Sequence, residues 1–154
     1  MSNNLERLIK QSVPFKSDYV KAELGLIYVS SLINNEAFHY YKRYQLSLQQ
    51  YNILRILRGQ FPRAINISSI KEGMLDRMSD VSRIAERLSK MGLIIKQPNM
   101  IDKRNADITI SEKGLELLRL IDEDGNNNQS LIHKLPQDDI WQLNELLDKI
   151  LNGV

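Results

Sequence analysis

Apolar residues recur every three or four positions through much of the chain, a spacing typical of amphipathic helices. Residues 17–44 carry two apolar stripes, so we expect one long helix, capped by Ser17, that packs against two neighbours. A second helix is expected to begin at Ser47 and to end before Pro62, and a short third one covers residues 66–74. The first half of the chain is therefore predicted to be mostly helical.

The fourth predicted helix has two distinct sides. It is expected to begin at Ser79 and to end at Gly92. Its apolar residues follow the pattern i, i+3, i+4, i+7 and are expected to face a core: Val81, Ile84, Ala85 and Leu88. The opposite side carries hydroxyl groups and cations, on Ser79, Ser82, Arg83, Arg87 and Lys90. Such a helix docks by one side and offers the other to a partner.

The spacing changes after this helix. Residues 93–97 are rich in β-branched and apolar types, residues 106–110 alternate, and a polar loop separates them, so we expect a β-hairpin. Ser111 begins a fifth helix, and residues 137–152 form a last one with a strong apolar stripe. The predicted fold class is mainly α with a small β-hairpin wing.

The order of these elements is that of a winged helix-turn-helix lobe, expected over residues 45–111. Helical regions at 1–44 and 112–154 flank it. The length of 154 residues, with 42% hydrophobic and 26% charged residues, fits one globular chain. The absence of cysteine excludes disulfides, zinc fingers and thiol chemistry and fits a cytoplasmic protein. No apolar run is long enough to cross a membrane, and the first residues do not resemble a signal peptide.

The charges are segregated, although the net charge is only +2. Residues 1–41 are neutral overall, residues 42–104 carry a net +8, and residues 105–154 carry a net −6. A basic middle predicts a polyanion-binding module, and the acidic end is expected to lie away from it. The same charges could also form a solvated basic face without a partner.

The helix-turn-helix order makes double-stranded DNA the expected polyanion. A helix with one docked side can place the other side in the major groove, where arginine binds guanine or phosphate. The hairpin can reach the minor groove beside it. The alternative is a winged helix that serves only as a protein-interaction module, with Arg83 and Arg87 paired to Asp80 and Glu86.

Several motifs, taken together and in order, resemble the multiple-antibiotic-resistance regulator (MarR) family of transcription factors. The resemblance covers the segment from Ser47 to Leu118. It rests on residues 46–54, on Ser79–Leu88 with Lys90–Ile94, on the loop Asp102-Lys103-Arg104, and on Ile108–Leu115. One departure is the stretch 69–74, which lacks a leucine-alanine pair usual before the recognition helix and leaves the role of Arg77 open.

The resemblance implies a cytoplasmic transcription regulator that binds an inverted-repeat operator as a homodimer. We expect a repressor, although the sequence does not distinguish a repressor from an activator. The resemblance implies that Arg104 reaches the minor groove, that Asp102 orients it and that Lys103 faces phosphate. The expected DNA contacts are Arg77, Ser79, Ser82, Arg83, Arg87, Lys90, Asp102, Lys103 and Arg104.

The terminal helices are the expected dimerisation region, since the last one has more apolar positions than the surface of a small lobe needs. A last helix that closes a monomeric core is the alternative. The residues expected in the dimer contact are Val20, Leu24, Ile140, Leu143, Leu147 and Ile150.

Many relatives are released from DNA by small aromatic ligands. A corresponding pocket here could include Phe38, His39, Tyr41, Tyr51 and Arg55, with ordinary core packing as the favoured alternative. No glycine-rich phosphate loop, nucleophile elbow or His-Glu-x-x-His motif is present, so no enzyme is expected. The two histidines are isolated, and neither a metal nor another cofactor is expected.

Overall fold

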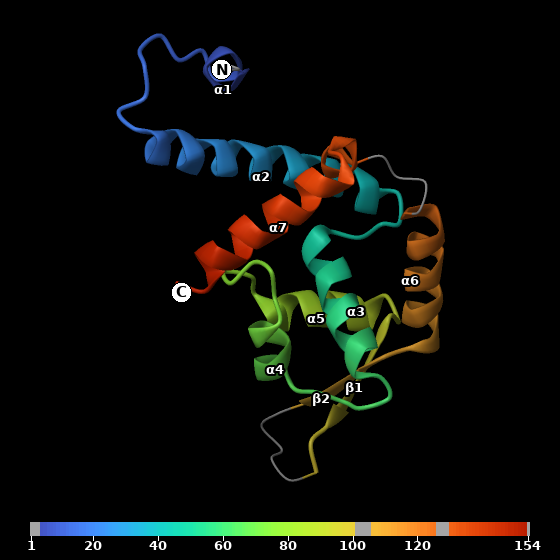
Figure 1. The fold of residues 1–154 in the computed structure, drawn as a ribbon. Coiled ribbons are helices and arrows are strands. Elements are labelled where there is room, and N and C mark those ends of the chain that lie inside the picture. The colour runs from blue at the N-terminus through green and yellow to red at the C-terminus, as the bar shows by residue number, and fades with distance from the viewer. Residues whose placement is uncertain (1–3, 101–105, 126–129, 154) are drawn as a thin grey trace. The chain divides into compact units, whose positions relative to one another are not determined.

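The computed structural model describes residues 4–100, 106–125 and 130–153 and is mainly helical with one β-hairpin, as predicted (Figure 1). The chain divides into two compact units, residues 1–37 and 38–154, which are described separately. The elements are α1 (Asn4–Leu8), α2 (Asp18–Lys42), α3 (Leu48–Gln60), α4 (Ile67–Glu72), α5 (Val81–Lys90), β1 (Ile94–Pro98), β2 (Ala106–Ile110), α6 (Glu112–Gly125) and α7 (Gln137–Leu151), with a 3₁₀ turn at Leu131–Lys134.

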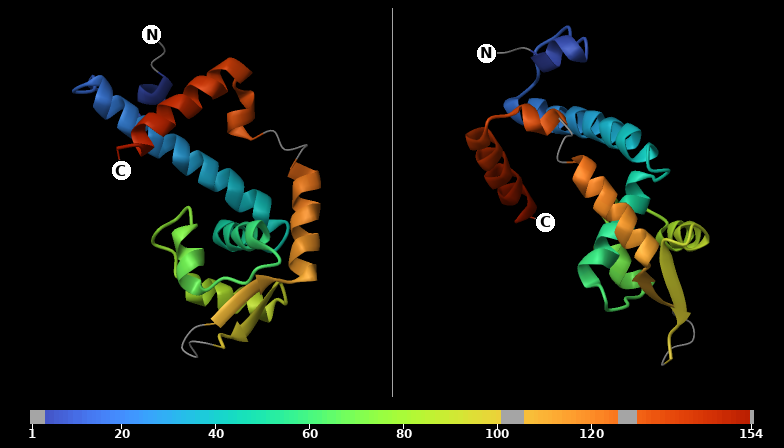
Figure 2. Two further views of the ribbon diagram at one scale, coloured as in Figure 1. Left: turned by 60° about the horizontal axis from the view of Figure 1, so that its bottom comes forward. Right: turned by 90° about the vertical axis from the view of Figure 1, so that its right-hand side faces the viewer.

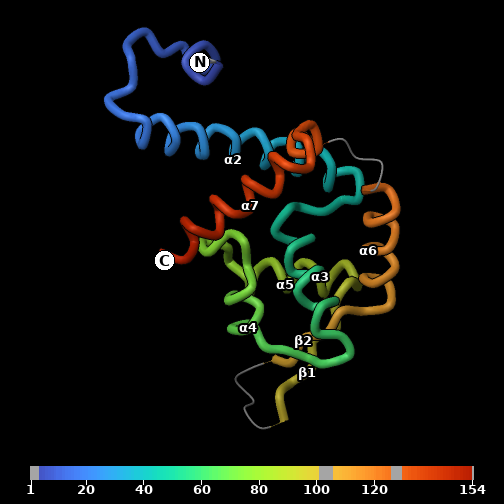
Figure 3. The backbone as a smooth tube through the Cα atoms, in the orientation of Figure 1, coloured from blue at the N-terminus to red at the C-terminus, as the bar shows by residue number. Residues whose placement is uncertain are grey.

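A single apolar core holds together α3, α4, α5, the hairpin and α6, which we call the lobe (residues 46–125). Figure 3 shows the backbone passing through α3, α4 and α5 in succession before it enters the hairpin. The largest fully buried apolar side chains come from every one of these elements: Ile53, Leu54, Leu57, Ile70, Leu88, Leu93, Ile108, Ile110 and Leu118. The predicted stripe of α5 is confirmed, with Val81, Ala85 and Leu88 buried and Ile84 half-buried.

Side-chain caps determine where the helices of the lobe begin. Ser47 forms a capping box with Gln50, in which each side chain accepts a hydrogen bond from the other residue's backbone N–H. Asn66 caps α4 by accepting from the backbone N–H of Ser69. The prediction that Ser79 begins α5 is wrong: Asp80 is the cap, because its carboxylate accepts from the backbone N–H of Arg83 at 3.1 Å.

The hairpin is anchored to the lobe at its base. β1 and β2 are antiparallel, with Ile94 opposite Ile110 and Pro98 opposite Ala106. Ile65 and Ile108 exchange two backbone hydrogen bonds of 3.0 and 2.8 Å, which tie β2 to the segment before α4. Figure 2 shows the hairpin projecting from the lobe beside α5.

Gly114 shows how closely α6 approaches the base of the hairpin. A Cβ at this position would lie 2.3 Å from the carbonyl oxygen of Leu93 and 2.7 Å from a side-chain carbon of Ile110. The backbone of α6 can therefore pack this closely only because residue 114 has no side chain. Leu118 and Ile121, further along α6, complete the core of the lobe.

The long helices outside the lobe bury little. None of the 25 residues of α2 and none of the 15 residues of α7 is fully buried. Of the residues predicted to form the dimer contact, Leu24 and Ile150 are exposed, by 38% and 56%, and the others are half-buried: Val20, Ile140, Leu143 and Leu147. No helix in the described ranges is long and apolar enough to cross a membrane.

Candidate nucleic-acid interface

The outer side of α5 is the candidate DNA-binding surface, because its inner side is fixed in the core. Burial of Val81, Ala85 and Leu88 turns the opposite side chains to solvent. The exposed residues on that side are Ser82, Arg83, Glu86, Arg87 and Lys90. The polar side predicted from the sequence therefore exists, and it presents three cations and one carboxylate along one helix.

Arg83 and Arg87 are available to bind an anion. Glu86 forms an ion pair with Lys96 of β1 at 2.8 Å, rather than with either arginine. Asp80 is occupied as the cap of the helix. Within the described part of the chain no ion pair involves Arg83, Arg87 or Lys90, so the pairing that the protein-interaction alternative assumed is not observed.

The turn between α4 and α5 is held by an aspartate that the sequence did not single out. The Asp76 carboxylate accepts hydrogen bonds from the backbone N–H of Met78 and from the Ser79 hydroxyl, each at 3.0 Å. Ser79, a predicted DNA contact, is half-buried and bonded to this aspartate. Arg77 is exposed on the same turn.

The wing residues Asp102, Lys103 and Arg104 lie outside the described residues, so their predicted roles are still predictions. What the structure describes is the base of the hairpin and its attachment. The Asn99 amide donates to the Asp107 carboxylate at 2.9 Å, across the hairpin. Lys96 links β1 to α5 through Glu86, so the wing and the helix share a charged contact.

The acidic end of the chain does not stay away from the basic middle, and this prediction is wrong. The C-terminal turns of α6 pair directly with two of the basic residues. Arg58 binds Asp122 at 2.5 Å, and Arg43 binds Asp124 at 2.9 Å. The two carboxylates thus neutralise cations on α3 and after α2, whereas no described carboxylate pairs with the cations of α5.

A tyrosine cluster lies at the same end of α6. The Tyr44 hydroxyl donates to Asp124 at 2.6 Å, and the Tyr40 hydroxyl donates to the backbone carbonyl of Ile121 at 3.0 Å. Tyr41 stacks on Tyr51 with ring centroids 4.2 Å apart. Burial raises the pKa of both Tyr41 and Tyr44 above the usual range; the next cause is the neighbouring Tyr51 for Tyr41 and the hydrogen bond to Asp124 for Tyr44.

The five residues predicted for a ligand pocket make three separate contacts. Tyr41 stacks on Tyr51, and Phe38 meets His39 edge to face at 5.3 Å. Arg55 donates to the side-chain oxygen of Asn52. The two stacked tyrosines fit the alternative of core packing, and a ligand pocket at these residues stays a prediction.

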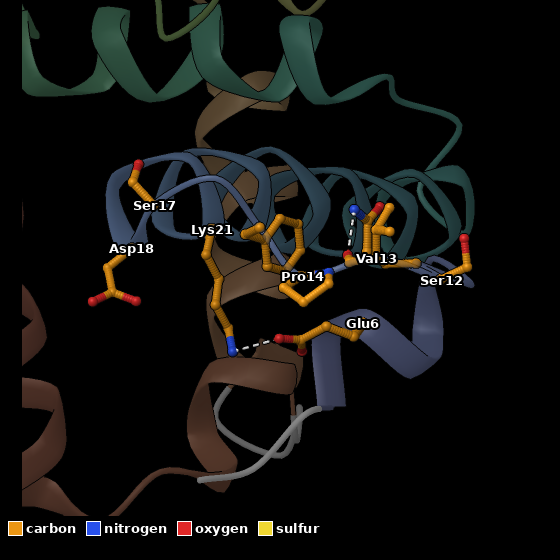
Figure 4. A pocket seen from close by; sticks show the side chains of 9 residues that line it. Glu6, Ser12, Val13, Pro14, Ser17, Asp18 and Lys21 are labelled. Atoms are coloured by element: carbon orange, nitrogen blue, oxygen red, sulfur yellow. Dashed lines mark hydrogen bonds and ion pairs between the residues drawn. The ribbon is translucent and has the colours of Figure 1, made fainter.

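A cavity of about 550 Å³ lies in the other unit, where the segment after α1 folds against α2 (Figure 4). The Lys21 ammonium binds a Glu6 carboxylate oxygen at 2.7 Å, and this contact lowers the pKa of Glu6. None of the predicted site residues lines this cavity, whose walls also include Val13, Pro14 and Phe15. In the described residues no cluster of metal-ligating side chains is found.

Two curated proteins are similar to this chain over most of its length. The chain is 26% identical over 124 residues to the HTH-type transcriptional regulator PecS of Dickeya dadantii (strain 3937), covering 79% of this chain and 75% of that protein. It is 25% identical over 125 residues to the HTH-type transcriptional regulator MgrA of Staphylococcus aureus, covering 81% of each. No family model matches the chain.

Solved structures of a MarR protein and of a further transcriptional regulator have the same fold. A mutant MarR from E. coli complexed with operator DNA matches with a TM-score of 0.76 and 18% identity, over 90% of this chain and 99% of that one. The organohalide-sensing regulator RdhR-CbdbA1625, in its 2,4-dichlorophenol-bound form, matches with a TM-score of 0.79 and 20% identity, over 94% of this chain and 88% of that one. These matches confirm the resemblance to the MarR family that the motifs indicated.

Proposed function

We propose that this chain, which has the fold of the MarR transcription regulators, binds an inverted-repeat operator as a homodimer and regulates transcription. The observation that carries the proposal is the outer side of α5, where three cations have no ion-pair partner among the described residues. Its similarity to two HTH-type transcriptional regulators supports the general class. A protein-interaction module would not need such a row of unpaired cations.

Each contact has an expected role. Arg83 lies near the start of α5, where side chains reach base edges, so it would bind a base, while Arg87 and Lys90 would bind phosphate. Ser79, Ser82 and Arg77 would add contacts at the entrance to the groove. At the wing, Arg104 would enter the minor groove with Asp102 orienting it, and Lys103 would face phosphate.

The terminal regions would supply the dimer. The flanking regions at 1–44 and 112–154 would bring two copies together, chiefly through the unburied apolar residues of α2 and α7. A twofold dimer places two recognition helices about one DNA turn apart, about 34–36 Å, so half-site centres should be about ten base pairs apart.

Release by a small aromatic ligand is the proposed means of control. The support is that the structural relative RdhR-CbdbA1625 is described as organohalide sensing and was solved with 2,4-dichlorophenol. The dimer would have two conformations that differ in the distance between its two lobes. Such a ligand would act by binding the conformation that does not fit the operator more tightly than the one that does. Thermal-shift titration with a panel of phenols, in the presence and absence of operator, would test it.

Selection of bound sequences from a random DNA pool is the decisive experiment for the proposal. We expect an enriched inverted repeat, with binding that weakens steeply as salt rises. Arg83→Ala should weaken binding to the enriched site by about 1–3 kcal/mol and relax one position in each half-site. Arg104→Ala should weaken binding to all sequences more evenly and lower the salt slope by up to about two phosphate equivalents per dimer.

Arg119→Ala is the matched control, because Arg119 is an exposed arginine of α6 that pairs with Glu116 and Glu123. It removes the same charge and should leave operator affinity unchanged. Enrichment of no sequence, or an unpaired half-site, would contradict the proposal. If the protein binds other proteins but not DNA, the alternative of a protein-interaction module would be favoured instead.

A further inference from the structure

We propose that Glu86 is a specificity-determining residue of the recognition helix and accepts a hydrogen bond from the amino group of a cytosine in each half-site. This inference rests on the proposed DNA-binding function. It concerns the one carboxylate on a surface that otherwise carries cations and hydroxyl groups.

Glu86 lies on the outer side of α5 with Arg83 and Lys90. Successive residues of an α-helix turn by about 100°, so Arg83, Glu86 and Lys90 fall within an arc of about 60°. This arc lies opposite the buried residues Val81 and Ala85. Arg87 and Ser82 flank it on either side. A helix that presents Arg83 and Lys90 to the major groove therefore presents Glu86 as well, at a level between them along the helix axis.

A carboxylate in this position is repelled by DNA phosphates. It can favour DNA binding only if it also forms a specific hydrogen bond to a base. In the major groove, guanine and thymine present oxygen acceptors, which repel a carboxylate. Adenine places its N7 acceptor beside its amino group, whereas the N4 amino group of cytosine has no neighbouring acceptor on the same base. Cytosine is therefore the base that an ionised glutamate accepts best.

The ion pair with Lys96 is compatible with this contact. The Lys96 ammonium lies 2.8 Å from one carboxylate oxygen, and no described residue donates a hydrogen bond to the second oxygen, which can accept from a base. The hydrogen bond from Lys96, its charge and the charge of Lys90 lower the pKa of Glu86, so the group is ionised at neutral pH. The Glu86 side chain is still 54% exposed, so a base edge can reach it.

The simplest alternative is that Glu86 only joins α5 to β1. Two variants separate the roles. Lys96→Met breaks the ion pair but keeps the Glu86 carboxylate. Glu86→Gln keeps the shape of the side chain but adds an N–H donor, so that the amide can bind both the N6 and the N7 atom of adenine. A purely structural pair predicts equal losses of thermal stability for both variants and no change in base preference for either.

The experiment is selection from a random DNA pool with the full-length dimer of each variant. We expect the wild-type protein and Lys96→Met to enrich cytosine at one position of each half-site. Glu86→Gln should shift that position toward adenine, and Glu86→Ala should lose the preference there. In direct titrations with one half-site changed, the affinity ratio between the cytosine site and its guanine counterpart should fall from about 5- to 150-fold in the wild type to about one in Glu86→Ala.

Glu116→Gln is the control, since Glu116 is an exposed carboxylate of α6 whose pKa is likewise lowered by its arginine partner. It should leave the enriched site unchanged. An operator whose base preferences are identical for wild type, Glu86→Gln and Glu86→Ala overturns the inference and leaves the proposed function intact. A wild-type protein that enriches adenine at the Glu86-dependent position also overturns it. A wild-type protein that enriches no sequence overturns both.

Discussion

The lobe and the long helices outside it solve the problem of burying apolar surface in opposite ways. The lobe has a core drawn from α3 to α6 in which residues such as Ile53, Leu54 and Leu118 are completely buried. α2 and α7 are longer than most helices of the lobe, yet neither buries a single residue, and Trp141 and Leu151 are more than 60% exposed. One chain is therefore enough to complete the lobe, whereas the terminal helices need a further surface, which we propose is a second copy.

The largest effect is expected from a cavity in the lobe. Leu54→Ala removes a fully buried side chain and should lower the free energy of unfolding by about 2–5 kcal/mol. Because this core lies within one chain, the midpoint of denaturation should fall equally at low and high protein concentration. Chemical denaturation at two concentrations checks it, and a loss that vanishes at high concentration would contradict the contrast between the two regions.

The next effect should be confined to association. Leu147→Asp places a charge in the proposed dimer contact and should weaken dimerisation by at least about 2 kcal/mol, or about thirty-fold in the dissociation constant. Unlike Leu54→Ala, its effect on stability should depend on protein concentration.

Sedimentation of Leu147→Asp beside Gln142→Asp measures this effect. The control adds the same charge to the exposed opposite side of α7 and should keep the dimer. A Leu147→Asp protein that stays dimeric and binds DNA normally would place the dimer contact elsewhere.

A smaller effect is expected at a helix cap of the lobe. Ser47→Ala removes one half of the capping box of α3, because the backbone N–H of Gln50 loses the hydroxyl that accepts its hydrogen bond, and should cost about 1 kcal/mol of stability. The exposed Ser68, inside α4, is the control, and Ser68→Ala should change stability little. Equal losses in thermal unfolding for the two variants would show that the cap contributes nothing measurable.

The smallest effect at accessible pH concerns the tyrosine cluster. Tyr41 and Tyr44 have pKa values raised by burial in the folded protein, whereas in the unfolded chain tyrosine ionises near pH 10. The folded state thus holds these protons more tightly, so stability is complete below about pH 10 and falls as pH rises beyond it.

Denaturation of Tyr44→Phe from pH 8 to pH 11 measures this effect. The variant should lose less stability over that range than the wild type. Tyr19→Phe is the control at an 88% exposed position and should follow the wild-type curve. If the stability of Tyr44→Phe depends on pH in the same way as that of the wild type, the tyrosine cluster is not the cause of the loss at high pH.

Helical spacing predicted the lobe well, because burial on one side leaves a strong periodic pattern. The four positions of α5 predicted to be inside are buried or half-buried, and the order of helices and strands agrees with the structure. The wrong cap at Ser79 has a physical cause. Serine and aspartate are equally good caps; in the structure the Ser79 hydroxyl donates to Asp76, and the Asp80 carboxylate accepts from the backbone N–H of Arg83.

Ion pairs between residues far apart in the chain could not be predicted from the sequence. Nothing local indicates that Glu86 binds Lys96, ten residues away on a strand, or that Asp122 and Asp124 reach back to Arg58 and Arg43. Such contacts are fixed by the packing of α6 against α3 and of α5 against β1. The net charge of the acidic end therefore could not show that two of its carboxylates neutralise basic residues in the middle of the chain.

The two hydrogen bonds between Ile65 and Ile108 also bear on how the protein avoids aggregation. Unpaired strand edges recruit further strands, and a two-stranded sheet would ordinarily have two such edges. The Ile65 segment occupies the outer edge of β2 at Ile108, so that edge is partly closed. The edge of β1 carries Lys96 and ends at Pro98, and both residue types oppose the addition of another strand. The hairpin is thereby hindered from pairing with the hairpin of another molecule.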